Sequence, residues 1–176
     1  MQMADEIVTL GLKDLGYEYV NTDDLWLQLE RSPEGKLIPG KNFGGPGEEG
    51  MRNLSAYIHG KGLKFGVYGA AGETTCAKAA GNLYHERADA AQLASWGVDL
   101  FKYDECGENN LQSFAKFSVM RDALNATGRP IVFSYEPHIT VPISWPPFVG
   151  NLWRTFSGQQ SVIQQMYPES GANCGT

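Results

Sequence analysis

The chain has 176 residues, of which 42% are hydrophobic and 19% are charged. This is enough apolar material for one globular domain with a sizeable core. The formal net charge of -6 offers no basic surface for nucleic acid or for an anionic membrane. No signal peptide and no membrane span is visible in the sequence. We therefore expect a single domain over residues 1–176.

One unit recurs along the chain: a helix-like stretch, a glycine, an apolar run of β-type residues and a polar strand end. The glycines are Gly16, Gly62, Gly97 and Gly128, each where a helix would stop and where a missing Cβ permits positive φ. The strands predicted after them are residues 17–24, 63–68, 98–104 and 131–136, and a fifth, without a preceding helix, is residues 151–156.

Apolar residues at helical spacing predict amphipathic helices between these strands. The predicted apolar faces are Met3, Ile7 and Leu10; Met51, Leu54 and Ile58; Tyr84, Ala88 and Ala91; and Phe117, Met120 and Leu124. Strands that alternate with helices imply parallel pairing with right-handed crossovers. The sequence therefore predicts an α/β layer or a (β/α) barrel, in which the long loop over residues 27–50 helps to build the ligand-binding face.

Asp104 is the leading candidate for catalysis. It ends a predicted buried strand, where a parallel α/β layer places its ligand crevice. Lys102, two residues earlier, shares the same strand face and would keep Asp104 ionised. The alternative is an ordinary strand-end aspartate that caps the next helix, and this stretch by itself supports both interpretations equally.

The predicted strand ends together supply a polar set too large for a core. Its members are Asp23, Asp24, Tyr68, Lys102, Asp104, Glu136 and Arg154. Carboxylates accept hydrogen bonds from sugar hydroxyls, and rings such as Trp26 and Tyr68 would cover the apolar face of a sugar. The alternative is a Mg²⁺ or Ca²⁺ site, which the cations Lys102 and Arg154 oppose. His59, His85 and His138 show no metal-ligand spacing, so we expect no metal and no cofactor.

Several of these segments resemble one known family. They are Asp23-Asp24, Gly62-Leu63-Lys64-Phe65-Gly66-Val67-Tyr68, Trp96-Gly97-Val98-Asp99, Lys102-Tyr103-Asp104-Glu105-Cys106, Ala123-Leu124-Asn125-Ala126-Thr127-Gly128-Arg129-Pro130-Ile131 and Asn151-Leu152-Trp153-Arg154. From residue 3 to residue 156 the chain is similar to the catalytic barrel of the α-galactosidase / α-N-acetylgalactosaminidase family of retaining glycoside hydrolases.

The resemblance implies a fold, a substrate and a role for each polar residue. The family fold is a (β/α)8 barrel followed by an antiparallel β domain, and its substrate is terminal α-linked galactose of glycans or glycolipids. Asp104 corresponds to the nucleophile, and the predicted sugar contacts are Asp23, Asp24, Tyr68, Lys102, Glu136 and Arg154. Glu136 corresponds to the residue that reads the 2-position in the galactosidase branch. Cys76 and Cys106 match a paired position, which implies a disulfide.

The chain departs from the family pattern at the acid/base residue. The family has an aspartate there, whereas the matching residue here is Gly158, followed by Gln159 and Gln160. A missing general acid lowers the rate by about 10²–10⁴-fold. The alternative to an active glycosidase is therefore a non-catalytic pseudoenzyme that acts as a glycan-binding or structural subunit.

The matched segments supply about five of the eight βα units. We expect a partial catalytic barrel without the family's C-terminal β domain. Because bare sheet edges invite pairing with other chains, we expect a partner chain or self-association to cover them.

Two sequons and an odd number of cysteines bear on the compartment. Asn53 and Asn125 begin N-x-S/T sequons, and the chain has three cysteines. Asn125 is predicted in a turn between a helix and a strand, whereas Asn53 falls inside a helix. Together these features predict a secreted or lysosomal/vacuolar glycoprotein.

Overall fold

The computed structural model describes residues 1–43, 47–107, 111–137 and 144–154. Its centre is a sheet of five parallel strands in the order β1-β2-β3-β4-β5, so neighbours in sequence are neighbours in space. The strands are β1 (Tyr19–Asn21), β2 (Lys64–Ala70), β3 (Leu100–Asp104), β4 (Val132–Glu136) and β5 (Leu152–Trp153). This confirms the predicted α/β class, as part of the wall of a (β/α) barrel.

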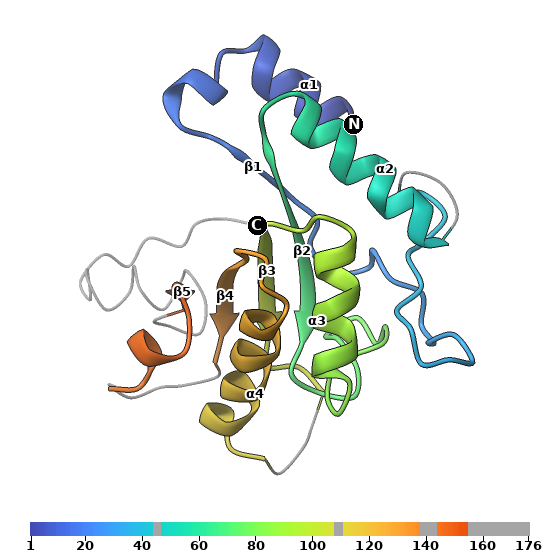
Figure 1. The fold of residues 1–176 in the computed structure, drawn as a ribbon, viewed down its shortest axis with the longest axis vertical. Coiled ribbons are helices and arrows are strands. Elements are labelled where there is room, and N and C mark those ends of the chain that lie inside the picture. Colours follow the sequence, from blue (N-terminus) through green and yellow to red (C-terminus); the bar gives the residue numbers. More distant parts are fainter. Residues whose placement is uncertain (44–46, 108–110, 138–143, 155–176) are drawn as a thin grey trace, which may run out of the picture.

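Helices connect the strands. The α-helices are α1 (Gln2–Thr9), α2 (Gly47–Gly60), α3 (Glu86–Ser95) and α4 (Ser113–Ala126), and the 3-10 helices are η1 (Lys13–Leu15) and η2 (Pro146–Phe148). α3 and α4 lie side by side in front of the sheet, and α1 lies beside α2 (Figure 1). Among the described helices, none has both the length and the apolar character needed to cross a membrane.

Glycines end the helices as the repeat predicts. Gly16, Gly62, Gly97 and Gly128 all have positive φ, between 69° and 95°. A residue with a Cβ would be strained in this conformation, so these four positions fix where each helix stops and the chain turns toward the next strand. The first strand is shorter than predicted: β1 covers three residues rather than 17–24.

The helix-facing side of the sheet carries an aromatic core. Phe101 and Tyr103 of β3 and Tyr135 of β4 are almost completely buried. Phe117 of α4 closes this layer, with its ring centroid 4.9 Å from that of Tyr135. Because side chains alternate along a strand, burial of these residues turns the intervening residues of β3 and β4 to the opposite face.

The register of the strands aligns these intervening residues with one another and with Tyr68 of β2. Tyr68 is paired with Lys102 on the neighbouring strand. Asp104 is paired on one side with Ala70 and on the other with Glu136. Paired residues of parallel strands point to the same side, so Tyr68, Lys102, Asp104 and Glu136 gather at the carboxyl end of the sheet.

Two of the four predicted helix faces are correct. Met51, Leu54 and Ile58 of α2, and Phe117, Met120 and Leu124 of α4, are buried against the sheet.

The predicted face of α3 is wrong. Ala88 and Ala91 are exposed, and Tyr84 precedes the helix and is 73% exposed. The buried side contains the apolar Ala90 and Leu93 together with Asp89 and Gln92, which have partners in the long loop after β1. The two polar residues interrupt the apolar spacing that would have revealed this face.

The predicted face of α1 is also wrong. Met3 and Leu10 are 63% and 69% exposed, Ile7 is partly buried, and Ala4 is the buried residue of this helix.

Candidate active site

Asp104 is held at the end of β3 in a fixed orientation. Its side chain is buried. Oδ2 accepts a hydrogen bond of 3.0 Å from the Tyr68 hydroxyl, and Oδ1 accepts one of 2.8 Å from the backbone N–H of Glu105. Burial, the nearby charge of Asp104 and this hydrogen bond raise the pKa of Tyr68 well above its ordinary value. Tyr68 therefore stays protonated and acts as a donor to Asp104.

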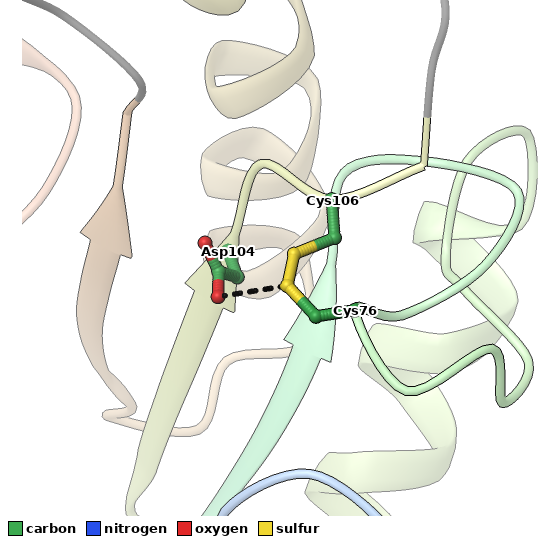
Figure 2. A group of neighbouring side chains, drawn as sticks. All are labelled: Cys76, Asp104 and Cys106. Atoms are coloured by element: carbon green, nitrogen blue, oxygen red, sulfur yellow. Dashed lines mark hydrogen bonds between the residues drawn. A yellow bond between two sulfur atoms is a disulfide. The ribbon is translucent and has the colours of Figure 1, made fainter. Parts of the chain in front are cut away.

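A disulfide between Cys76 and Cys106 lies against the Asp104 carboxylate (Figure 2). The two Cα atoms are 5.0 Å apart, and Sγ of Cys76 lies 3.5 Å from Oδ2 of Asp104. These three residues form a group whose potential metal-ligating atoms lie within 4.8 Å of one another. Because disulfide sulfurs are not thiolates, the group does not suit a metal ion. The disulfide instead anchors the loop after β2 to the end of β3.

Lys102 is the central cation of the site. Its Nζ atom lies 2.7 Å from a carboxylate oxygen of Asp23 and 3.5 Å from one of Glu136. Burial acts to lower the pKa of Lys102, but the hydrogen bond with Asp23 and the charges of Glu136, Asp23 and Asp104 together raise it. Lys102 therefore remains charged between carboxylates that come from three different strand ends.

The adjacent residues Asp23 and Asp24 point in different directions. Asp23 is 69% exposed at its side chain and faces Lys102. Burial acts to raise the pKa of Asp23, but the hydrogen bonds from Lys102 and from the Asp24 backbone lower it below the ordinary value. The Asp24 carboxylate accepts backbone hydrogen bonds from Leu25 and Ala77, at 2.7 and 2.8 Å. Asp24 thus ties the first loop to the loop that contains Cys76.

Glu136 and Arg154 complete the row of polar strand ends. Arg154 follows β5 and donates a hydrogen bond to the Glu136 carboxylate. Glu136 is thereby ion-paired with both Arg154 and Lys102. The strand-end residues from Asp23 on the first strand to Arg154 on the fifth therefore form one connected chain of opposite charges.

Trp26 does not have the position that the sequence suggested. It is 1% exposed, and its ring packs edge-to-face on Trp96, with centroids 5.9 Å apart. Its indole N–H donates a 2.7 Å hydrogen bond to the Tyr68 carbonyl. Trp26 is therefore packed against β2 and has no exposed ring face to cover a sugar.

The segment after Asp104 contains a buried ion pair that sequence reasoning missed. Glu105 accepts a 2.5 Å hydrogen bond from Ser113, and Lys116 Nζ lies 2.8 Å from the same Glu105 oxygen. The pair connects α4 to the residue next to Asp104. A lysine on the buried side of a predicted helix was the available signal.

Some predicted residues lie at other positions than expected or outside the residues that the structure describes. Asn125 lies in the last turn of α4 rather than in the following turn, and its side chain is exposed, as is that of Asn53 on α2. Gly158 and Cys174 lie outside the described residues.

Comparison with known proteins places the chain in a family. Residues 1–160 match the family described as Alpha galactosidase A. Alpha-galactosidase 3 of Arabidopsis thaliana is 46% identical over 88% of this chain and 35% of its own length. Alpha-N-acetylgalactosaminidase of Gallus gallus is 39% identical over 86% of this chain and 35% of its own length. The chain thus spans about a third of the length of these relatives.

A solved structure agrees with this placement. The α-galactosidase of Saccharomyces cerevisiae, determined with raffinose, superposes with a TM-score of 0.71 at 37% identity over 76% of this chain and 30% of that chain. The sequence match and the structural superposition identify the same family. The chain belongs to the α-galactosidase family.

Proposed function

We propose that this chain carries the galactose-binding and nucleophilic part of a retaining α-galactosidase-type site. The observation that supports this most strongly is the setting of Asp104. It is buried at a strand end, oriented by Tyr68, and followed along the same edge by Lys102, Asp23, Glu136 and Arg154. Alternating charges of this kind offer both donors and acceptors to the hydroxyls of a terminal α-linked galactose.

The first chemical step uses Asp104 as the nucleophile. A carboxylate oxygen of Asp104 attacks the anomeric carbon of galactose and forms a C–O ester bond. The bond from that carbon to the leaving oxygen breaks, and the leaving group departs with the electron pair. In the second step a water oxygen attacks the same carbon, the ester bond breaks, and Asp104 regains its negative charge while the water loses a proton.

The proton transfers are where the chain departs from its family. A natural galactoside needs an acid to protonate the leaving oxygen, and the same residue then takes the proton from water. Gly158 corresponds to this acid, and the residues after it are Gln159 and Gln160. Glu136 is ion-paired with Arg154 and Lys102, which is the arrangement of a carboxylate rather than of a proton donor. We infer that the nucleophilic step survives and that both proton transfers are impaired.

Leaving-group dependence tests this proposal. 4-Nitrophenyl α-galactoside releases a stable phenolate without protonation, so we expect a burst of nitrophenolate followed by slow turnover. Azide, which attacks without a base, should speed the slow phase. Melibiose and raffinose, whose leaving groups need a proton, should be cleaved about 10²–10⁴-fold more slowly than an intact enzyme would cleave them.

Two variants make the test specific. Asp104→Asn should abolish both the burst and the azide effect. Asp122→Asn, at an exposed aspartate on α4, should leave both unchanged. A folded protein that shows no burst, or one that shows the same burst after Asp104→Asn, would contradict the proposal.

A glycan-binding pseudoenzyme is the second candidate, favoured by Gly158. In that case the protein would bind methyl α-galactoside, and Lys102→Met would weaken the binding, but nitrophenolate would not be released. Binding without a burst therefore separates the two functions.

We also propose a setting for the chain. The Cys76–Cys106 disulfide and the exposed Asn53 and Asn125 sequons suit passage through the secretory pathway, to a secreted or lysosomal/vacuolar destination. The outer edges of β1 and β5 would be covered by further strands, from the rest of a longer chain, a partner chain or a second copy. Sedimentation of the purified chain at several concentrations distinguishes self-association from the other two sources.

A further inference from the structure

A second concave site lies where the loops after β1 and β2 meet. The backbone N–H of Ala80 donates to the Gln28 carbonyl at 3.4 Å and joins the two loops. An open cavity of about 380 Å³ lies between them. Leu29 and Tyr84 supply its apolar lining, and Glu30, Glu73 and His85 supply polar groups. The sequence suggested Tyr84 only for the apolar face of a helix, and the family resemblance gave none of these residues a role in binding.

Tyr84 is presented to solvent by a strained backbone. Its φ is 68°, a conformation that a bulky side chain rarely adopts, and its side chain is 73% exposed. Hydrogen bonds on both sides hold the conformation: Leu83 N–H donates to Gly72 at 3.1 Å and His85 N–H donates to Asn82 at 3.0 Å. An exposed ring gains little from burial here, so its own contribution to folding does not offset the strain.

Arg31, which lines the cavity, is neutralised and held by a network of hydrogen bonds behind it. Arg31 donates two hydrogen bonds to Asp89, of 2.7 and 2.6 Å, and one each to the carbonyls of Gly35 and Gly81. Asn82 donates to Asp89 and accepts from the Ala70 backbone, which connects this network to the end of β2. Because Asp89 balances Arg31, the carboxylates of Glu30 and Glu73 give the lining of the cavity a negative charge.

These features select one class of ligand. The carboxylates disfavour phosphates and other anions. A metal ion is also disfavoured: among the described residues, the acidic and sulfur groups that converge closely enough for an ion are those around the disulfide, and Glu30, Glu73 and His85 are not among them. An aromatic face flanked by hydrogen-bonding side chains suits a neutral saccharide ring. We propose that this cavity binds a saccharide unit stacked on Tyr84.

The loop after β2 contributes to both sites. Glu73 belongs to the loop that the Cys76–Cys106 disulfide anchors beside Asp104. A saccharide unit at Tyr84 would therefore lie on the same edge of the sheet as the candidate active site. The binding itself does not depend on catalysis at Asp104, so the two proposals fail independently.

Site-resolved NMR titration with raffinose tests the proposal. In ¹⁵N-labelled protein, raffinose should shift the backbone amides of Tyr84, His85 and Glu73 in one saturable step. Tyr84→Gly should weaken this binding by about tenfold, the value of an aromatic contact. The same variant should raise the melting temperature by about 2–4 °C, since glycine accepts positive φ without strain. Loss of binding in a more stable protein cannot result from misfolding.

Control variants and probes define the outcome. Tyr84→Phe keeps the ring and should keep the affinity within about twofold, and Tyr17→Ala, at another exposed tyrosine, should change nothing at this site. Unchanged raffinose binding after Tyr84→Gly would overturn the proposal. So would an absence of shifts at residues 73 and 83–85, or saturable shifts there with Ca²⁺ or inorganic phosphate but not with raffinose.

Discussion

At the scale of single residues, the side chains of the candidate site orient one another through hydrogen bonds and ion pairs. The positions of Asp104 and Lys102 were predictable because Asp104 ends a buried strand and Lys102, two residues earlier, shares its face. Their partners were not, since pairing of Lys102 with Asp23 depends on how β1 and β3 lie on either side of β2. Trp26 was misjudged because an aromatic residue near a strand end can cover a ligand or support the strand, and sequence does not distinguish the two positions.

Removal of one hydroxyl tests how Asp104 is oriented. Tyr68→Phe deletes the donor to Asp104 Oδ2 and should lower the free energy of unfolding by about 1.5–3 kcal/mol, the value of a hydrogen bond to a charged group. It should also slow the nitrophenolate burst. Urea denaturation and stopped-flow absorbance measure the two effects.

Tyr135→Phe is the matched control for that experiment. Tyr135 is as buried as Tyr68, but its hydroxyl has no hydrogen-bond partner within the described part of the chain. Its removal should therefore leave stability unchanged or slightly higher. Equal losses in the two variants would show that tyrosine packing, rather than the bond to Asp104, explains the result.

At the scale of elements, hydrophobic periodicity predicted the buried faces of α2 and α4 but not those of α1 and α3. α2 and α4 present Met51, Leu54, Phe117 and Met120 to the sheet, so their spacing revealed the buried face. α3 turns Asp89 inward, where Arg31 neutralises it. A buried ion pair has no periodic signature, and its two partners lie 58 residues apart.

A charged cluster at the opposite end of β3 predicts a pH dependence. Asp99 accepts hydrogen bonds from the Phe65 backbone at 2.8 Å and from Arg129 at 2.6 Å, and lies 2.6 Å from His59 Nε2. Burial acts to raise the pKa of Asp99, but these three partners outweigh it and hold the pKa below the ordinary value of 3.8. The cluster joins α2, β2 and the start of β3 at the amino end of the sheet.

The sign of the effect follows from the lowered pKa. Asp99 contributes stability that is complete above its unfolded pKa of 3.8 and is lost as the pH falls through its lower folded value. Asp99→Asn should therefore be less stable than the parent protein at about pH 6, with a difference that shrinks toward about pH 3. Urea melts at both values check this, with Asp14→Asn as the background. A constant difference across this range would contradict the role assigned to Asp99.

At the scale of the whole molecule, the alternation of strands and helices was predictable from the sequence, and the structure defined the length of each element. Glycines at Gly16, Gly62, Gly97 and Gly128 recur because each helix must stop and turn in the same way. Such repetition can be read from the sequence. The cavity at Tyr84 could not be predicted in this way, since it forms only where two loops distant in sequence meet.

The disulfide is the covalent constraint on this fold. Cys76 and Cys106 are 30 residues apart, and closing a loop of this length stabilises the fold by about 3–4 kcal/mol in the chain-entropy model. Titration of unfolded, unreduced protein should find one thiol, that of Cys174, and titration after reduction should find all three. Three thiols without reductant would contradict both the disulfide and the proposed oxidising compartment.

We propose that Asp104 is a competent nucleophile in a site that lacks its acid partner. Intact-protein mass spectrometry after mixing with 4-nitrophenyl α-galactoside tests it most directly, because impaired hydrolysis should let the covalent intermediate accumulate. We predict a mass increase of one hexosyl unit, mapped by peptide fragmentation to Asp104, removed by azide and absent from Asp104→Asn. An adduct on another residue, or no adduct on a folded protein that binds methyl α-galactoside, would show that Asp104 is not the nucleophile.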